Sequence, residues 1–343
     1  MTKPIKRATL NDVAALAGVS LGSASRALSI PNQVKPDTLE KVNKAVEQLG
    51  YVRNGAAQAL VSKKTKTVAA IYPTLDNPIY ATSVNALQQT LWQKGYQLFI
   101  ASHEYNRTRE IKIVQTMIER GVDGIILVGT DHDPAIFETL NRRQIPYVLT
   151  WSTDFTNYPH CIGFSNQQAS FDLVQALIAK GHRKIAICTG AKLHNDRQRA
   201  RVTGALQALS LHSYAIPDEY VIEKPLSIEG GQESVQELMA LADPPTAIVF
   251  GNDLQAIGAI DQAIAKGMRI PQDLSITGFD DISMAQIVKP SLTTIRVPVN
   301  EIGISAANLI LNLIHQQTES NTKLPPLSAD IMLRDSVGPP RAN

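Results

Sequence analysis

The sequence is poor in cysteine, in aromatic residues and in long apolar runs. Its 343 residues include two cysteines, which excludes a disulfide scaffold and a cysteine-rich zinc site. Cys161 and Cys188 each lie in an apolar run, which predicts buried, unreactive thiols. No apolar run reaches the roughly 18 residues of a membrane span, and no apolar signal segment follows the basic N-terminus. We therefore expect a cytoplasmic protein with no membrane contact.

Three motifs of common enzyme classes are also missing. The chain contains no P-loop, no His-Glu-x-x-His and no Gly-x-Gly-x-x-Gly, so nucleotide, zinc-protease and dinucleotide chemistry have no support. Asp280 and Asp281 are adjacent, but no third carboxylate or histidine is spaced to complete a metal site with them. We expect no enzyme activity, no metal and no cofactor.

Composition and charge describe a globular chain with a distinct N-terminal part. Apolar residues make up 44% and charged residues 19%, and the length allows two or three domains. Residues 1–66 hold 11 Lys and Arg against 4 Asp and Glu, whereas the remainder holds 22 against 27. This asymmetry favours a head that binds a polyanion, although a solvated basic face would look the same.

The head has the signals of three short helices. Thr9 is placed to cap the first helix, with Asp12 three residues later as in a capping box. Gly18 is suited to the left-handed end of that helix, and Ser20 caps the second helix. A third helix is predicted over 36–49. Two short helices separated by such a turn are typical of a helix-turn-helix.

The rest of the chain alternates short apolar runs with helix-length amphipathic stretches. The alternation runs over 68–149 and repeats over 161–279. Such a pattern predicts two parallel sheets covered by helices on both faces. Ligands of these folds bind at the carboxyl ends of the strands.

Three segments of the head, Thr9–Ser20, Ser25–Leu28 and Leu49–Asn54, together resemble the LacI/GalR family of bacterial transcription regulators. The resemblance continues through the whole chain. It implies a small all-α helix-turn-helix head plus an α/β body of two doubly wound parallel-sheet lobes, like a periplasmic binding protein. The implied boundaries are 1–53 for the head, 54–66 for a hinge helix and linker, and 67–343 for the effector-binding and dimerisation body. Its N-lobe is expected at about 67–164 and 296–326, and its C-lobe at about 165–295 and 327–336.

The resemblance assigns DNA contacts to the head and hinge. It implies a second helix in the major groove, where Leu21 and Gly22 select the operator and Arg26 grips a guanine; a phosphate contact is the alternative for Arg26. The hinge residue Leu60 would wedge into the minor groove, the alternative being a plain linker. The implied DNA-binding residues are Thr9, Ser20, Leu21, Gly22, Ser25, Arg26, Asn54, Ala57 and Leu60.

The resemblance also places an effector between the two lobes. Arg201 of an Arg-x-x-Gly motif would meet its polar groups, Asp280 would accept from its hydroxyls, and Trp151 would stack on a sugar face. Arg201 could instead pair with a surface carboxylate. The polar stretch 194–199 is predicted to be a solvated helix start. The alternative is that His194 or Arg197 reaches an anionic ligand. The implied effector-binding residues are Leu75, Ile79, Tyr80, Trp151, Arg197, Arg201, Asn252 and Asp280.

The function that these observations predict is sequence-specific repression of transcription. A small polyhydroxylated effector, either a sugar or a sugar acid, would release the protein from its operator; nucleobase sensing stays open. The alternatives are a corepressor-activated regulator of the same family and, with less support, a sugar-binding transport protein. We expect a homodimer on a pseudo-palindromic operator, because no heptad tail follows Ser336.

Overall fold

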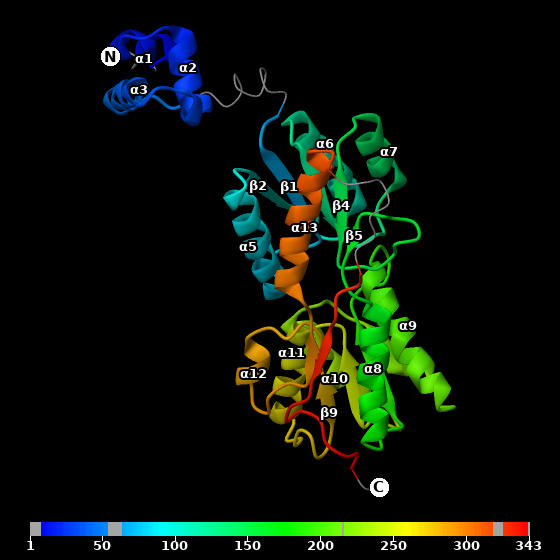
Figure 1. The fold of residues 1–343 in the computed structure, drawn as a ribbon. Coiled ribbons are helices and arrows are strands. Elements are labelled where there is room, and N and C mark those ends of the chain that lie inside the picture. Colours follow the sequence, from blue (N-terminus) through cyan, green and yellow to red (C-terminus); the bar gives the residue numbers. More distant parts are fainter. Residues whose placement is uncertain (1–7, 54–63, 215, 318–324, 342–343) are drawn as a thin grey trace, which may run out of the picture. The chain divides into compact units, whose positions relative to one another are not determined.

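The computed structural model describes residues 8–53, 64–214, 216–317 and 325–341. The chain divides into two compact units, Met1–Thr65 and Lys66–Asn343, which we call the head and the body (Figure 1). Each is described by itself.

The described part of the head is a bundle of helices. Its elements are α1 (Leu10–Ala17), α2 (Leu21–Ser29), a 3-10 turn at Pro31–Gln33 and α3 (Pro36–Leu49). The predicted capping box is present, since the Thr9 side chain accepts from the Asp12 N–H and the Asp12 carboxylate accepts from the Thr9 N–H at 2.8 Å. Gly18 ends α1 in the left-handed conformation at φ 64°, and the Ser20 side chain caps α2.

A small apolar core holds these helices together. Val13 of α1, Ala24 of α2 and Val42 of α3 are each completely buried in it. The small residues Ala24 and Ala27 of α2 face this core, whereas the opposite side of α2 is exposed. The Arg53 guanidinium donates to the Leu28 carbonyl oxygen at 2.9 Å and ties the chain after α3 to the end of α2.

The N-lobe of the body is built on a five-stranded parallel sheet in the order β2-β1-β3-β4-β5. Its strands are β1 (Thr67–Tyr72), β2 (Gln97–Ser102), β3 (Gly124–Val128), β4 (Tyr147–Thr150) and β5 (Cys161–Ile162). Its helices are α5 (Pro78–Gln93), α6 (Arg107–Glu119), α7 (Pro134–Arg142) and α13 (Val299–Ile314).

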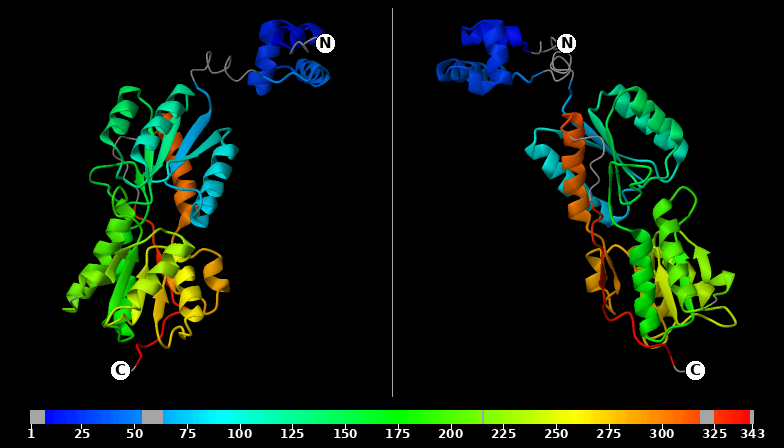
Figure 2. Two further views of the ribbon diagram at one scale, coloured as in Figure 1. Left: turned by 180° about the vertical axis from the view of Figure 1, so that it is seen from behind. Right: turned by 45° about the vertical axis from the view of Figure 1, so that its right-hand side comes forward.

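Helices cover both faces of this sheet. Figure 2 shows α5 and α13 on one face and α6 and α7 on the other. The alternation of strand side chains explains both cores: Val68 and Ala70 of β1 belong to the cluster that contains Leu87 of α5, whereas Ala69 packs in the cluster that contains Val114 of α6. The sheet is thus buried on both sides, as the apolar runs predicted.

The C-lobe contains a four-stranded parallel sheet in the order β7-β6-β8-β9. Its strands are β6 (Ile185–Thr189), β7 (Val221–Glu223), β8 (Ala247–Phe250) and β9 (Ser275–Thr277). Its helices are α8 (Asn166–Ala179), α9 (Asp196–Leu211), α10 (Ile228–Leu238), α11 (Asp253–Ala265), the short α12 (Met284–Ile287) and a 3-10 turn at Asp218–Tyr220. The fold class is therefore the predicted one, with two parallel-sheet α/β lobes.

The chain passes between the lobes in three places. It leaves β5 for α8, returns through β10 (Thr294–Arg296) to α13, and comes back through β11 (Asp330–Met332), which pairs with β10 in antiparallel fashion. The Leu327 N–H donates to the Gly163 carbonyl oxygen at 2.8 Å and holds two of these crossings together. No helix in the described part combines the length and apolar character that crossing a bilayer requires.

Candidate functional site

The exposed face of α2 carries the residues that the sequence assigned to operator selection. Leu21 is 48% exposed, Gly22 and Arg26 are exposed, and Ser25 is half-buried. The Arg26 Nε donates to the Gly22 carbonyl oxygen one turn earlier, at 3.3 Å. A Cβ added at Gly22 would meet only the Ser20 hydroxyl at 4.0 Å. This face therefore presents the predicted residues to a partner without using them to hold the head together.

Ser20 also lies in a Gly-x-Ser-x-Gly pattern, from Gly18 to Gly22. In serine hydrolases that pattern is a tight turn between a strand and a helix. Here it connects two helices, and the Ser20 side-chain oxygen accepts a hydrogen bond from the Ser23 N–H at 3.1 Å. The pattern is a helix cap in this chain. The hinge residues Asn54, Ala57 and Leu60 lie outside the described residues.

The body has a cleft between its two lobes at the carboxyl ends of their strands. From the N-lobe, Asn77, Ile79 and Tyr80 follow β1, Tyr105 follows β2, and Trp151 follows β4. The C-lobe side consists of Asn195, Arg197, Gln198, Arg201, Leu226, Asn252 and Asp280. The free space between them is about 20 Å³, close to one water molecule. The side chains of the two lobes thus contact each other directly across this inner cleft.

Aromatic rings form the N-lobe wall of the inner cleft. The ring centroid of Tyr80 lies 5.3 Å from that of Tyr72 and 5.0 Å from that of Trp151, both edge to face. Trp151 has φ 67° and Tyr105 has φ 56°, a left-handed conformation that bulky side chains rarely adopt. Such backbone strain is retained where the surrounding structure needs the side chain in one place, as binding sites do.

Arg201 is held entirely by its own lobe. Its Nε donates to the Asn166 side chain at 2.9 Å and its Nη1 to the Gly251 carbonyl oxygen at 2.5 Å. The guanidinium carbon lies 3.5 Å from the centroid of the Phe279 ring, within cation–π range. The surface pairing that the sequence left open for Arg201 is therefore wrong, because this side chain is buried at the cleft.

Arg197 crosses the cleft. Its Nη1 donates to the Val128 carbonyl oxygen of the N-lobe at 3.1 Å and to the Asp196 carboxylate at 2.9 Å. Gly129 has φ 91°, and a Cβ there would come within 2.0 Å of the same nitrogen, so the guanidinium occupies the space that glycine leaves. Arg197 is 7% exposed, and the solvated helix start that the sequence favoured is wrong for this residue. Its neighbour Arg199 is exposed and pairs with Asp131 at 2.6 Å.

Two aspartates on the C-lobe side are buried. Burial raises the pKa of Asp280 to about 6, against the opposing effects of Arg201 and of Asn77, whose amide donates to the Asp280 carboxylate at 2.9 Å. Burial and the charge of Asp280 raise the pKa of Asp253 to about 7, although Asp253 accepts from the Thr294 hydroxyl and the Ile282 N–H. Asp281 instead braces the loop by accepting from Arg296 and Arg334.

The remaining predicted cleft residues are placed differently. Asn252 lies in the cleft lining, but its oxygen caps α11 at the Gln255 N–H, 2.9 Å away, and its nitrogen donates to the Leu226 carbonyl oxygen at 3.2 Å. Leu75 is 52% exposed and is not part of the lining. The structure thus brings together all the predicted effector-binding residues except Leu75.

Sequence reasoning missed several residues of the lining. Asn77 precedes Pro78, a combination typical of a helix start, and this signal identifies the cap but not the bond to Asp280. Gln198 lies three residues before Arg201, so helix periodicity places both on one face. Tyr105 had no signal, because it sits in a loop without a periodic pattern.

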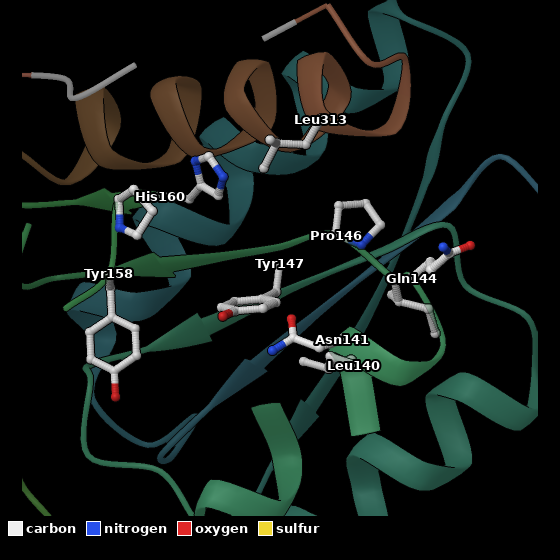
Figure 3. A pocket seen from close by; sticks show the side chains of 10 residues that line it. Leu140, Asn141, Gln144, Pro146, Tyr147, Tyr158, His160 and Leu313 are labelled. Carbon is white, nitrogen blue, oxygen red and sulfur yellow. The ribbon is translucent and has the colours of Figure 1, made fainter. Parts of the chain in front are cut away.

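A larger hollow of about 420 Å³ lies elsewhere in the N-lobe (Figure 3). Tyr147 and Tyr158 line it together with His160 and Leu313. Because Tyr147 begins β4 and His160 immediately precedes β5, this hollow is at the amino ends of the strands, opposite the cleft. Ligands of such sheets bind at the carboxyl ends, where the cleft between the lobes lies.

Both cysteines are buried, and burial raises the pKa of each thiol to about 12. Their burial is as predicted, and a thiol with so high a pKa forms little of the reactive thiolate. The described residues contain no group of three or more His, Cys, Asp or Glu side chains placed to hold a metal ion.

Comparison with known proteins identifies both units. Residues 9–54 match the family of bacterial regulatory proteins known as the lacI family, and residues 65–327 match the periplasmic binding proteins and sugar binding domain of the LacI family. The chain is 33% identical to catabolite control protein A of Priestia megaterium over 90% of this chain and 93% of that protein. It is 32% identical to the probable HTH-type transcriptional repressor ExuR of Bacillus subtilis, over 96% and 98% of the two chains.

A solved structure supports the same assignment. The complex of the transcriptional regulator CelR with cellobiose has a TM-score of 0.71 at 27% identity, covering 96% of this chain and all of that one. ExuR and CelR are both named as regulators of transcription. Family models match both the head and the body, and the exposed face of α2 is free to meet DNA. This chain therefore belongs to the LacI family and is a DNA-binding regulator of transcription.

Proposed function

We propose that this regulator is a repressor that leaves its operator when a small polyhydroxylated effector, a sugar or a sugar acid, binds in the cleft. One observation carries the proposal: forked polar side chains and aromatic rings converge there from both lobes. Arg, Asp, Asn and Gln present paired donors and acceptors that match neighbouring hydroxyls, and aromatic rings match the flat face of a sugar. The CelR relative was solved with cellobiose, which supports the same ligand class.

The arrangement also supports a means of coupling. An effector shifts a conformational equilibrium only if it binds the two states with different affinity. Because Asn77 and Trp151 come from one lobe and Arg201 and Asp280 from the other, contacts to a ligand in this cleft depend on how the lobes are arranged. Residues 54–66 connect the body to the head, and we propose that two chains pair so that two heads read a pseudo-palindromic operator.

Other functions have less support. A corepressor-activated regulator would use the same cleft and differs only in the sign of the effect on DNA affinity. A sugar-binding transport protein has no use for the exposed α2 face. We propose that the chain is not an enzyme, and that it acts in the cytoplasm on operator DNA.

DNA binding is tested with duplexes that the purified full chain selects from a random pool. Fluorescence anisotropy should show specific binding that weakens steeply with salt, as phosphate contacts require. Arg26→Ala should reduce the preference for the selected duplex, whereas Lys41→Ala, on the exposed side of α3, should weaken all duplexes alike. Leu60→Ala should weaken specific more than non-specific binding. A protein with no salt-dependent duplex binding would contradict the proposed function.

Effector binding is tested by thermal shift with sugars, sugar acids, polyols and nucleobases. A ligand at 100 times its dissociation constant stabilises the folded state by about 2.7 kcal/mol, which such a shift reveals. The ligand found should then release the selected duplex. A ligand that tightens DNA binding would replace the inducer mechanism by the corepressor one.

A further inference from the structure

The hollow at the amino ends of the N-lobe strands has the size of a ligand site. Its volume is about 420 Å³, and pockets that bury small molecules run from about 300 to 1,000 Å³. The end of α7, the start of β4, the residues just before β5 and the last turn of α13 enclose it. It shares no lining residue with the cleft between the lobes, so the two are separate hollows.

Rings and an aliphatic side chain form the walls of this hollow. Tyr147 and Tyr158 each lie 5.3 Å, centroid to centroid, from the ring of Phe137, which supports both. Figure 3 shows the Tyr147 ring between Leu313 of α13 and Asn141 at the end of α7. Flat aromatic molecules pack against such rings offset or edge to face. The walls therefore favour a planar aromatic ligand.

The lining of the hollow carries no charge. None of its ten residues is Lys, Arg, Asp or Glu. Burial lowers the pKa of His160 and raises the pKa of Tyr147 and of Tyr158, so these three side chains are neutral near neutral pH. An ionised ligand would lose its hydration with no opposite charge in the lining to replace it. The lining thus favours an uncharged ligand, in contrast to the cleft, which holds Arg201 and Asp280.

Polar groups with unused hydrogen-bonding capacity lie at the hollow. Asn141 and Gln144 are exposed, and neither side-chain amide makes a hydrogen bond within the described residues. The Nδ1 of His160 is buried and has no hydrogen-bond partner in the described part of the chain. A buried polar atom without a partner is uncommon, and a bound molecule is one way to satisfy it. These three residues can supply donors and acceptors to the edge of a ligand.

Gln144 occupies a backbone position that usually belongs to glycine. It lies two residues after the end of α7 and has φ 54°. At the same place, α5, α6, α8 and α11 have a glycine with positive φ, whereas α9 and α13 have Ser213 and Gln316. Glycine adopts this conformation at no steric cost. The helix can therefore end without a side chain at this place, which leaves the Gln144 amide available for a role in the hollow.

We propose that this hollow is a second ligand site and that its ligand is an uncharged, planar aromatic molecule with hydrogen-bonding groups along one edge. The ligand ring packs on Tyr147 and against Leu313, and its polar edge faces Asn141 and Gln144. A side-chain amide pairs with such an edge as asparagine and glutamine pair with the two adjacent groups of an adenine base. The proposal does not depend on the effector class proposed for the cleft.

The test is calorimetric titration of the full chain with three matched pairs of probes: adenosine and adenosine monophosphate, nicotinamide and nicotinate, and indole-3-acetamide and indole-3-acetate. The first member of each pair is neutral, and the second is an anion with the same ring. At least one neutral probe should bind about tenfold or more tightly than its anion, because the lining has no charge to replace lost hydration. Saturable binding of no neutral probe, or equal binding of both members in every pair, would overturn the proposal.

A variant that does not endanger the fold assigns this binding to the hollow. Gln144→Gly removes the amide and places glycine at a left-handed position, so the thermal midpoint of unfolding should stay level or rise. The neutral probe should bind this variant roughly fivefold more weakly, through loss of a hydrogen bond. Gln316→Gly is the matched control, because it makes the same change at the same place after α13 and outside the lining. A probe with equal affinity for the two variants would contradict the assignment.

A cleft variant separates the two sites. Arg201→Ala removes a cleft side chain and leaves the lining of the hollow intact, so it should bind the neutral probe with the wild-type dissociation constant. Weaker binding by Arg201→Ala, together with wild-type binding by Gln144→Gly, would place the probe in the cleft and refute the second site.

Discussion

The amide of Asn77 in the N-lobe donates to the carboxylate of Asp280 in the C-lobe at 2.9 Å. The same Asn77 side chain accepts from the Ile79 N–H at 3.1 Å and so caps α5. One residue therefore both begins a helix and joins the lobes across the proposed effector site.

Comparing an Asn77 variant with a variant that loses only a helix cap separates these two roles. Asn77→Ala should lower the free energy of unfolding by about 1 kcal/mol through loss of the cap. It should also weaken effector binding roughly tenfold, because a hydrogen bond to a buried carboxylate is lost. Asn106→Ala is the control, since Asn106 caps α6 at the Arg109 N–H, 2.9 Å away, outside the cleft lining. Equal effector affinities in the two variants would contradict a role for Asn77 in the site.

Gly129 allows the lobes to approach. Gly129→Ala would place a Cβ within 2.0 Å of the Arg197 Nη1 and should hold the lobes apart, which small-angle scattering measures as a larger radius of the body. Gly267→Ala is the matched control, because Gly267 has φ 80° but open space around its Cβ. In both variants alanine must adopt a left-handed backbone conformation, which lowers the free energy of unfolding. A Gly129→Ala protein with unchanged dimensions and effector affinity would remove Arg197 from the lobe contact.

Asp253 should make stability depend on pH. Its folded pKa of about 7 lies above the ordinary aspartate value of 3.8, so the folded state holds a proton that the unfolded state releases. Its contribution is therefore most favourable below pH 4 and is lost as pH rises through 7, on the order of 4 kcal/mol in total at about 1.36 kcal/mol per pKa unit. Urea unfolding at pH 5 and pH 8 should show a fall in stability that Asp253→Asn reduces. An identical fall in the variant would show that Asp253 titrates normally.

Gly22 is a site where operator preference can change without loss of the fold. A Cβ there meets nothing closer than 4.0 Å, and Gly22 lies on the exposed face of α2. Gly22→Gln should therefore leave the thermal midpoint of unfolding within a few degrees and alter the duplex sequence that the protein selects. Selection of the wild-type duplex by Gly22→Gln would mean that this position does not contact bases.

The head was predictable because its signals are local. Thr9 and Asp12 are three residues apart, and Gly18 and Ser20 act on adjacent turns, so spacing alone indicates their roles. The parallel sheets followed from apolar runs that are buried on both faces. These features depend on neighbours in the sequence, where propensity and periodicity apply.

The cleft was less predictable because its contacts join distant segments. Motifs placed Arg201 and Asp280 at the site, but nothing local shows that Asn77 reaches across to Asp280, 203 residues away. The burial of Arg197 depends on a missing side chain at Gly129. The exposure of Leu75 depends on how its loop packs. Such properties are set by tertiary packing, which a single sequence does not encode in any periodic pattern.

The central claim is that the cleft controls the DNA affinity of the head, and one measurement tests it most directly. The effector identified by thermal shift is titrated into a complex of the protein with its selected duplex, followed by anisotropy, for wild type and for Arg201→Ala. We predict that wild type releases the duplex, and that Arg201→Ala binds the duplex normally but keeps it at every effector concentration. Release of Arg201→Ala at the wild-type effector concentration would contradict the account.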